Sequence, residues 1–119
     1  MQNYSTATVE GYATHDAVSR TTKTGKSVCT FGIAINHFSK ADEDPRVSFV
    51  DVEAWDKKGE FCAKTITKGK RVMVMGTLRQ DRWEGKDGKT QTKIKIIANE
   101  IRMIEQSRKE EKIPETVAK

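Results

Sequence analysis

Apolar residues alternate with small or polar ones in the stretch Ser27-Val28-Cys29-Thr30-Phe31-Gly32-Ile33-Ala34-Ile35-Asn36. Because successive side chains of a β-strand point to opposite faces, this period of two predicts a strand. Cys29, Phe31, Ile33 and Ile35 share one face, and the other face is also fairly apolar. Two apolar faces are typical of a strand in a small barrel, where one face lines the core and the other lines an interface or a cleft.

Strand-like segments lie on both sides of this stretch. We expect strands over 4–13, 27–36, 47–55, 71–79 and 90–103, an extended segment over 18–23, and one short helix over 56–66. Asp56 is expected to cap the start of the helix, and Gly69 is suited to a left-handed cap at its end. Turns are expected at Thr24-Gly25-Lys26 and at Asp87-Gly88.

The number and spacing of these elements predict an all-β fold. Five strands with one short helix between the third and the fourth fit a Greek-key barrel of the oligonucleotide/oligosaccharide-binding type, the OB-fold. A two-layer α+β sheet is the alternative. We expect the barrel to occupy residues 1–105 as one domain. Residues 106–119 are expected to form a short polar C-terminal tail, because the alternating pattern is lost there.

The composition predicts a small core and a charged surface. The 119 residues include 22 Lys and Arg and 17 Asp and Glu, which gives a formal charge of +5, and only 35% of them are hydrophobic. No stretch is apolar enough to span a bilayer and no signal-peptide pattern is visible, so we expect a cytoplasmic protein. Cys29 and Cys62 are interpreted as reduced thiols in the core. The basic balance suits an acidic partner.

Residues for catalysis are few. The two histidines, His15 and His37, lie in or beside expected loops, and no Cys–His or Ser–His spacing stands out. Thr24-Gly25-Lys26-Ser27 resembles the end of a phosphate-binding loop, but the upstream glycine is missing and a strand follows. The acidic run Asp42-Glu43-Asp44 is interpreted as a solvated loop. We therefore expect a protein that is not an enzyme and that uses no cofactor and no metal.

The strand expected over 47–55 carries an unusual face. Phe49, Asp51, Glu53 and Trp55 fall on one side of it, opposite the valines. Two aromatic rings beside two carboxylates are not typical of a core face. This strand is therefore the first sign of a binding site.

Aromatic and basic side chains together predict a surface for single-stranded nucleic acid. Unpaired bases stack on flat rings, at about 1–3 kcal/mol per base, and cations track the phosphate backbone. The candidate rings are Phe38, Phe49, Trp55 and Trp83, and the candidate cations near them are Lys57, Arg79, Arg82, Lys93 and Lys95. The alternatives are a place in the core for Phe49 and Trp83, closure of a barrel end by Trp55, an isolated loop position for Phe38, and a solvated strand face for Lys93 and Lys95.

Three blocks of the sequence follow one another in a characteristic order. The first contains Gly11, Asp16 and Arg20 and then the run from Gly25-Lys26 to Ala34-Ile35-Asn36. The second runs from Phe49 to Lys57 and continues as Lys68-Gly69-Lys70-Arg71-Val72-Met73-Val74-Met75-Gly76-Thr77-Leu78-Arg79-Gln80-Asp81-Arg82-Trp83. The third contains Asp87-Gly88 and Ala98-Asn99-Glu100-Ile101. Together, over about residues 3–104, these blocks resemble the bacterial single-stranded DNA-binding protein family.

The resemblance implies an OB-fold protein, usually a homotetramer. Such a protein binds single-stranded DNA without reading its sequence and protects it during replication, recombination and repair, at the nucleoid. Stacking roles are implied for Phe49, Trp55 and Trp83, with Phe38 a looser match. Phosphate contacts are implied for Arg20, Lys57, Lys68, Arg79 and Arg82.

The sequence departs from the family pattern in several places. Phe49 stands where the family commonly has Trp, and Asp51 and Asp81 occupy positions that are often basic. Each carboxylate lowers the expected number of ion pairs with phosphate and hence the salt dependence of binding. The family's acidic tip ending in Pro-Phe is not found, so the sequence does not predict recruitment of replication and repair proteins through it. An OB-fold accessory adaptor of the primosome, acting mainly through protein partners, is the alternative function.

Overall fold

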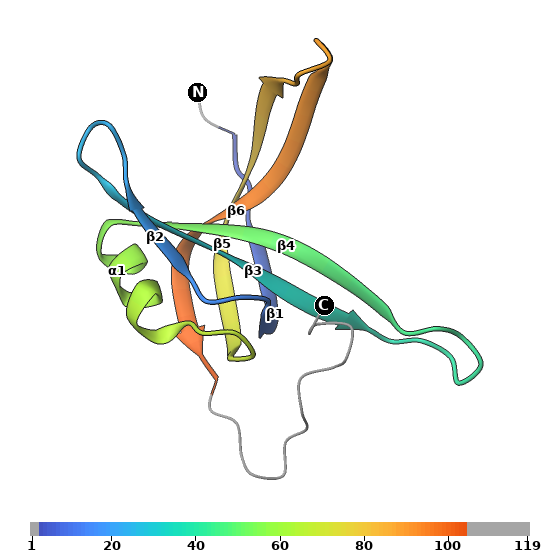
Figure 1. Ribbon diagram of the computed structural model, residues 1–119. Coiled ribbons are helices and arrows are strands. Elements are labelled where there is room, and N and C mark those ends of the chain that lie inside the picture. The colour runs from blue at the N-terminus through green and yellow to red at the C-terminus, as the bar shows by residue number, and fades with distance from the viewer. Residues whose placement is uncertain (1–2, 105–119) are drawn as a thin grey trace.

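A computed structural model describes residues 3–104 of the chain. Its elements are the strands β1 (Ala7–Ala13), β2 (Val18–Thr21), β3 (Ser27–His37) and β4 (Arg46–Trp55), the helix α1 (Asp56–Thr65), and the strands β5 (Arg71–Glu84) and β6 (Thr90–Met103). Figure 1 shows the strands curving around one barrel, with α1 at one end and the β3–β4 and β5–β6 hairpins projecting from it. The tail expected over 106–119 lies outside the described residues.

Five of the strands close into a barrel. The sheet runs in the order β1-β5-β6-β4-β3-β2, and an additional pairing joins β1 to β3. In this closing pair Tyr12 and Ala13 face Ala34 and Ile33, whereas the earlier part of β3 pairs with β2. The predicted OB-fold is therefore confirmed, and the two-layer alternative is wrong because the sheet returns on itself. The sixth strand, β2, is the segment expected only to be extended, and all four of its residues are exposed.

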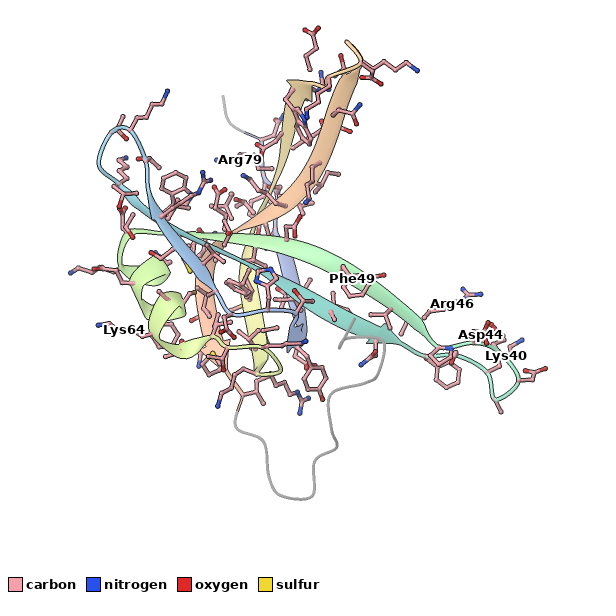
Figure 2. All side chains as sticks on the ribbon, in the orientation of Figure 1. Lys40, Asp44, Arg46, Phe49, Lys64 and Arg79 are labelled. Atoms are coloured by element: carbon pink, nitrogen blue, oxygen red, sulfur yellow. The ribbon has the colours of Figure 1, made fainter. Side chains whose placement is uncertain are left out.

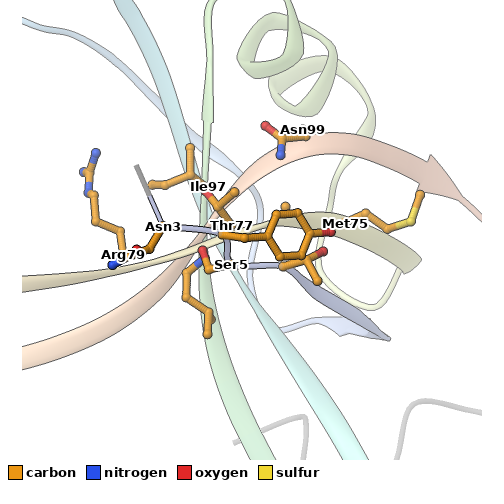
Figure 3. Close-up of a pocket in the computed structure, with 11 residues that line it drawn as sticks. Asn3, Ser5, Met75, Thr77, Arg79, Ile97 and Asn99 are labelled. Carbon is orange, nitrogen blue, oxygen red and sulfur yellow. The ribbon is translucent and has the colours of Figure 1, made fainter. Parts of the chain in front are cut away.

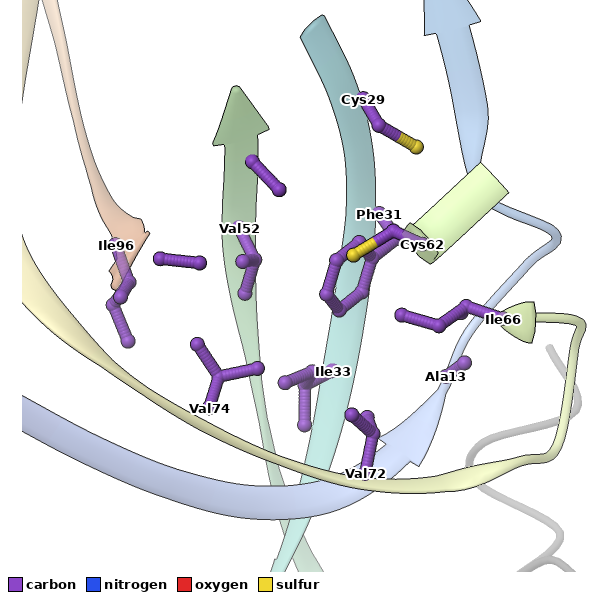
Figure 4. Close-up of a cluster of buried hydrophobic side chains, with 12 residues drawn as sticks. Ala13, Cys29, Phe31, Ile33, Val52, Cys62, Ile66, Val72, Val74 and Ile96 are labelled. Carbon is purple, nitrogen blue, oxygen red and sulfur yellow. The ribbon is translucent and has the colours of Figure 1, made fainter. Parts of the chain in front are cut away.

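The barrel is filled by alternate residues of its strands. Phe31, Ile33, Val52, Val74 and Ile96 are each at most 2% exposed and belong to one apolar cluster. Figure 4 shows Cys62 and Ile66, from α1 and the residue after it, beside the ring of Phe31. The helix thus plugs the end of the barrel, and both Cys29 and Cys62 are buried reduced thiols, as the sequence predicts.

The helix begins differently from the prediction. Trp55 stands at the N-cap position and no side chain caps the helix, so the expected capping role of Asp56 is wrong. Asp56 instead takes a φ of +55° at the first helical position, because β4 leads into α1 with no linker. The helix ends at Thr65, and Gly69, with a φ of +92°, lies in the following turn, where Lys70 N–H donates to the carbonyl of Thr67. The expected turns at Gly25 and Gly88 are found, both with positive φ.

The β5–β6 hairpin is longer than predicted. β5 continues past Arg79 to Glu84 and stays paired with β6 as far as Thr90, beyond the end of the barrel. A shift of register separates Met75 from Gly76, where a Cβ atom on Gly76 would lie 2.0 Å from the carbonyl oxygen of Ile97. This bulge marks the part of β5 beyond which the hairpin leaves the barrel (Figure 1).

A helix long and apolar enough to cross a membrane does not occur among residues 3–104.

The buried thiols give a first prediction. Burial raises the pKa of both, and for Cys62 burial together with the neighbouring Cys29 raises the pKa to about 12. Because the thiolate is the reactive form, both cysteines should alkylate with iodoacetamide at pH 8 at least about a hundredfold more slowly in the folded protein than in urea. Mass spectrometry of timed samples measures the two rates. Rapid modification of the folded protein would show that these thiols reach solvent.

Candidate nucleic-acid interface

Three strands bring the candidate residues onto one outer face of the barrel. The parallel pairing of β4 with β6 sets Asp51 opposite Lys95, and the antiparallel pairing of β5 with β6 sets Arg79 opposite the same lysine. Since side chains two residues apart share a face, Phe49, Glu53 and Trp55 join Asp51 there. Asp81 and Trp83 of β5 and Lys93 of β6 join it by the same rule. We call this surface the β4–β6 face.

The three large rings lie outside the barrel core. Phe49 is 61% exposed and Trp83 is 49% exposed, while Trp55 is half-buried. Figure 2 shows Phe49 midway along β4 and Arg79 where the β5–β6 hairpin leaves the barrel. A core position for Phe49 or Trp83, the alternative left open by the sequence, is therefore wrong. Phe38, at 92% exposure, follows the end of β3 in the loop to β4 and is not part of the face.

The centre of the face is a closed network of charges around Glu53. The side chain of Glu53 is only 4% exposed, although it points away from the core. Glu53 accepts hydrogen bonds from Trp55 Nε1 at 2.8 Å, Arg79 Nη2 at 3.0 Å and Lys95 Nζ at 2.6 Å. Asp81 completes the ring, at 2.7 Å from Lys95 Nζ and 3.5 Å from Arg79 Nε. The carboxylate therefore fixes the indole of Trp55 and two cations at once.

The network shifts the pKa values of its members. Burial raises the pKa of Glu53, but hydrogen bonds from Lys95 and Trp55 and the charges of Lys95 and Arg79 outweigh it, so the pKa lies below its ordinary value of 4.5. The hydrogen bond from Lys95 lowers the pKa of Asp81. Burial lowers the pKa of Lys95, yet its bonds to Asp81 and Glu53 raise it to a net value above 10.5. All three groups are thus held in their charged forms.

The remaining cations are distributed unevenly. Lys93 Nζ lies 2.5 Å from Asp51 Oδ2 on the face. Arg20 of β2 lies at the edge of the face, where it lines the same cleft as Asp51 and Lys93. Lys57, in the first turn of α1, lines a groove that begins at Trp55. Arg82 falls on the opposite side of the hairpin from Trp83, with Nη2 3.5 Å from Gln80 Oε1. Lys68 lies in the turn after α1, where its N–H donates to Asp16 Oδ1.

Two clefts adjoin the face. One of about 280 Å³ lies between β2 and the β5–β6 hairpin and contains Arg20, Asp51 and Lys93. The other, of about 810 Å³, lies at the bulge between β5 and β6, where Asn99 of β6 has no partner between Met75 and Gly76 of β5. It is lined by Asn3, Ser5, Met75, Thr77, Arg79, Ile97 and Asn99 among others (Figure 3).

Sequence reasoning missed Tyr4, which lines the larger cleft and is 89% exposed. The sequence around Tyr4 has the pattern of an ordinary strand, so nothing marked Tyr4 as a candidate site residue. It also missed the Glu53 network. The partners Arg79 and Lys95 lie 26 and 42 positions after Glu53 in the sequence, so no local pattern connects them.

Metal-binding side chains are not grouped in the described part of the chain: no set of three or more His, Cys, Asp or Glu residues is placed to hold an ion there.

Comparisons with known proteins agree on one family. The model of the single-strand binding protein family matches residues 4–104. The single-stranded DNA-binding protein of Treponema pallidum is 36% identical over 96 residues, which are 79% of this chain and 54% of that protein. The corresponding protein of Aquifex aeolicus is 34% identical over 114 residues, 87% of this chain and 77% of that protein. The chain thus spans little more than half the length of the first of these relatives.

A solved structure supports the fold. The Plasmodium falciparum SSB in complex with single-stranded DNA superposes with a TM-score of 0.78 and covers 88% of this chain and 98% of its own. At 19% sequence identity, this likeness concerns the fold alone.

The Glu53 network predicts how stability depends on pH. A depressed carboxyl pKa contributes stability that is present above its ordinary pKa and is lost as pH falls through the folded value. The raised pKa of Lys95 contributes stability that is present below 10.5 and is lost as pH rises through the folded value. Glu53→Gln should therefore lower the free energy of unfolding by about 1–3 kcal/mol at pH 7 and flatten its fall below about pH 4.5.

Urea denaturation between pH 3 and pH 10 measures this effect. Glu43→Gln is the matched control, because Glu43 pairs with Arg46 at 3.4 Å on the exposed loop and its loss should cost less than about 0.5 kcal/mol. Equal effects of the two substitutions would show that the network does not stabilise the fold.

Proposed function

The chain belongs to the single-strand binding protein family, and we propose that it binds single-stranded DNA independently of sequence and protects it during replication, recombination and repair. The observation that carries this proposal is the β4–β6 face. Rings from β4 and β5 stand outside the barrel there, beside cations from β5 and β6. The relatives named as single-stranded DNA-binding proteins support the same reading.

The spacing of the rings suits an unpaired strand better than a duplex. Phe49 and Trp55 are six residues apart on β4, about 20 Å at the rise of a strand. Trp83 lies four residues beyond Arg79 on the projecting hairpin, about 13 Å along β5. Flexible single strands can lay successive bases on platforms at such separations, whereas a duplex keeps its bases stacked on one another.

The cations divide into two groups with different roles. Arg20 and Lys57 are available to phosphates at the edges of the face, and Arg82 is available on the opposite side of the hairpin. Arg79 and Lys95 are engaged by Glu53 and Asp81, and Lys93 is engaged by Asp51. We therefore expect stacking to supply much of the affinity. We also expect the affinity to fall less steeply with salt concentration than the number of cations on the face would predict. Phe38 and Lys68 remain candidates for contacts at the ends of a longer path.

We also propose that the protein assembles with copies of itself, as a tetramer in keeping with the family resemblance. Among the described residues, β1 pairs with β5 from Ala7 to Tyr12 on one edge, but only Tyr12 and Ala13 pair with β3 on the other. The free edge from Ala7 to Gly11 offers backbone groups to a second strand. Beside it, the half-buried Met73 and Met75 lie on the outer side of β5. Sedimentation velocity with and without a dT oligomer measures the assembly.

Binding to a dT oligomer of tens of nucleotides tests the function. The oligomer should bind tightly, quench tryptophan fluorescence through stacking on Trp55 and Trp83, and bind more weakly as salt rises. A duplex of the same length is the control and should bind far more weakly. Equal affinity for the two would contradict the proposal. Weak, short-footprint DNA binding together with DNA-independent capture of replication proteins would favour the accessory adaptor instead.

Trp83 tests the stacking contribution directly. Trp83→Ala should weaken binding of the dT oligomer by about 1–3 kcal/mol, because one stacking platform is lost. Trp83→Phe keeps a flat ring and should recover most of the affinity. Since Trp83 lies on the hairpin outside the barrel, the urea midpoint should change little in either variant. Unchanged affinity with a large loss of stability would make Trp83 a structural residue.

A further inference from the structure

The cleft between β2 and the β5–β6 hairpin has a composition unlike that of a phosphate site. Its floor is formed by β3 and β4, and its volume of about 280 Å³ admits a single nucleobase. Arg20, Lys93 and Lys95 supply three positive charges to its lining, and Asp51, Glu53 and Asp81 supply three negative ones. A lining without net charge gains nothing from a phosphate group, so the cleft favours a neutral polar ligand.

The cleft also lies where a base would have no ring beneath it. Asp51 and Glu53 occupy the positions on β4 between Phe49 and Trp55. A strand stacked on both rings would cross about 20 Å between them, and the intervening bases would meet charged side chains instead of a ring. Such a base is recognised through hydrogen bonds at its edge.

Only some of the charged side chains that line the cleft keep donor or acceptor atoms for a ligand. Glu53 accepts three hydrogen bonds within the network, and Asp81 and Lys95 are joined to each other and to their neighbours. Asp51 is engaged through Oδ2 with Lys93, and its side chain is 45% exposed. A carboxylate has acceptor sites on both oxygens, and an ammonium group has three donors, so this ion pair retains acceptors and donors side by side.

We propose, on the basis of the proposed single-stranded DNA binding, that this cleft is a base-edge subsite in which the Asp51–Lys93 pair selects guanine. Guanine alone among the four DNA bases carries two adjacent donors, N1–H and N2–H, beside an acceptor, O6. The two donors match the carboxylate of Asp51, and O6 matches the ammonium of Lys93. Thymine offers one donor between two carbonyl oxygens, one of which faces the carboxylate unfavourably. Binding is thus independent of sequence overall, with a preference for guanine at one position.

Oligomers that differ by one exocyclic group test the subsite. A dT oligomer with guanine at every third position is compared with the same oligomer carrying hypoxanthine, which lacks only the N2 amino group and stacks almost equally well. Isolated guanines avoid the quadruplexes that guanine runs form. We expect the guanine oligomer to bind about three- to tenfold more tightly at one fixed salt concentration, which is the net contribution of one ordinary hydrogen bond.

Variants assign the preference to the cleft. Asp51→Asn should bring the guanine-to-hypoxanthine ratio close to one while strengthening binding of plain dT, since a carboxylate beside the phosphates is removed. Glu60→Gln, which removes one negative charge from an exposed position on α1, should leave the ratio as it is. Equal affinities of the wild type for the two oligomers, or a ratio that persists in Asp51→Asn, would overturn the subsite while plain dT still binds. Failure to bind any of the oligomers would overturn the subsite and the proposed function together.

Discussion

The parallel pairing of β4 with β6 is the constraint on which the rest of the molecule depends. Only three register pairs make it, Asp51 with Lys95, Val52 with Ile96 and Glu53 with Ile97. The middle pair points inward and joins two core residues across this short seam of the barrel. The outer pairs set the carboxylates of β4 beside the cations of β6 and β5. The same short seam therefore closes the core on one side and assembles the β4–β6 face on the other.

The fold and the candidate residues could be predicted to different degrees. The alternation in 27–36 and 47–55 specifies which side chains face inward, and both strands obey it because one face is buried. The turn at Asp87-Gly88 follows from local chemistry in the same way. The capping role given to Asp56 failed because the direct junction of β4 and α1, a tertiary requirement, overrides the local preference. The length of β5 was underestimated because its second half has no buried face and so no apolar alternation.

The β4–β6 face shows why a list of candidate residues does not give the charge balance of a surface. Arg79 and Lys95 are basic residues on the correct side of the barrel, as the sequence predicts. Their partners come from β4, so no local pattern reveals that Glu53 engages both and holds the indole of Trp55 as well. The sequence does mark Asp51 and Asp81 as departures from the family pattern. The structure adds that these carboxylates are paired with cations of the same protein. The centre of the face therefore carries several charges but no net charge.

The hairpin that carries Trp83 differs mechanically from the surface that carries Phe49 and Trp55. Beyond the barrel, β5 and β6 form a two-stranded ribbon, with Ile94 60% exposed on the side away from Trp83. A ribbon of two strands has no third neighbour or packed layer to resist torsion, whereas β4 is anchored in a closed cylinder. Trp83 therefore lies on a flexible hairpin, whereas Phe49 and Trp55 lie on a strand held in the rigid barrel. In the proposed binding of single-stranded DNA, we expect the hairpin to follow strands of differing curvature while the interior of the barrel keeps its packing.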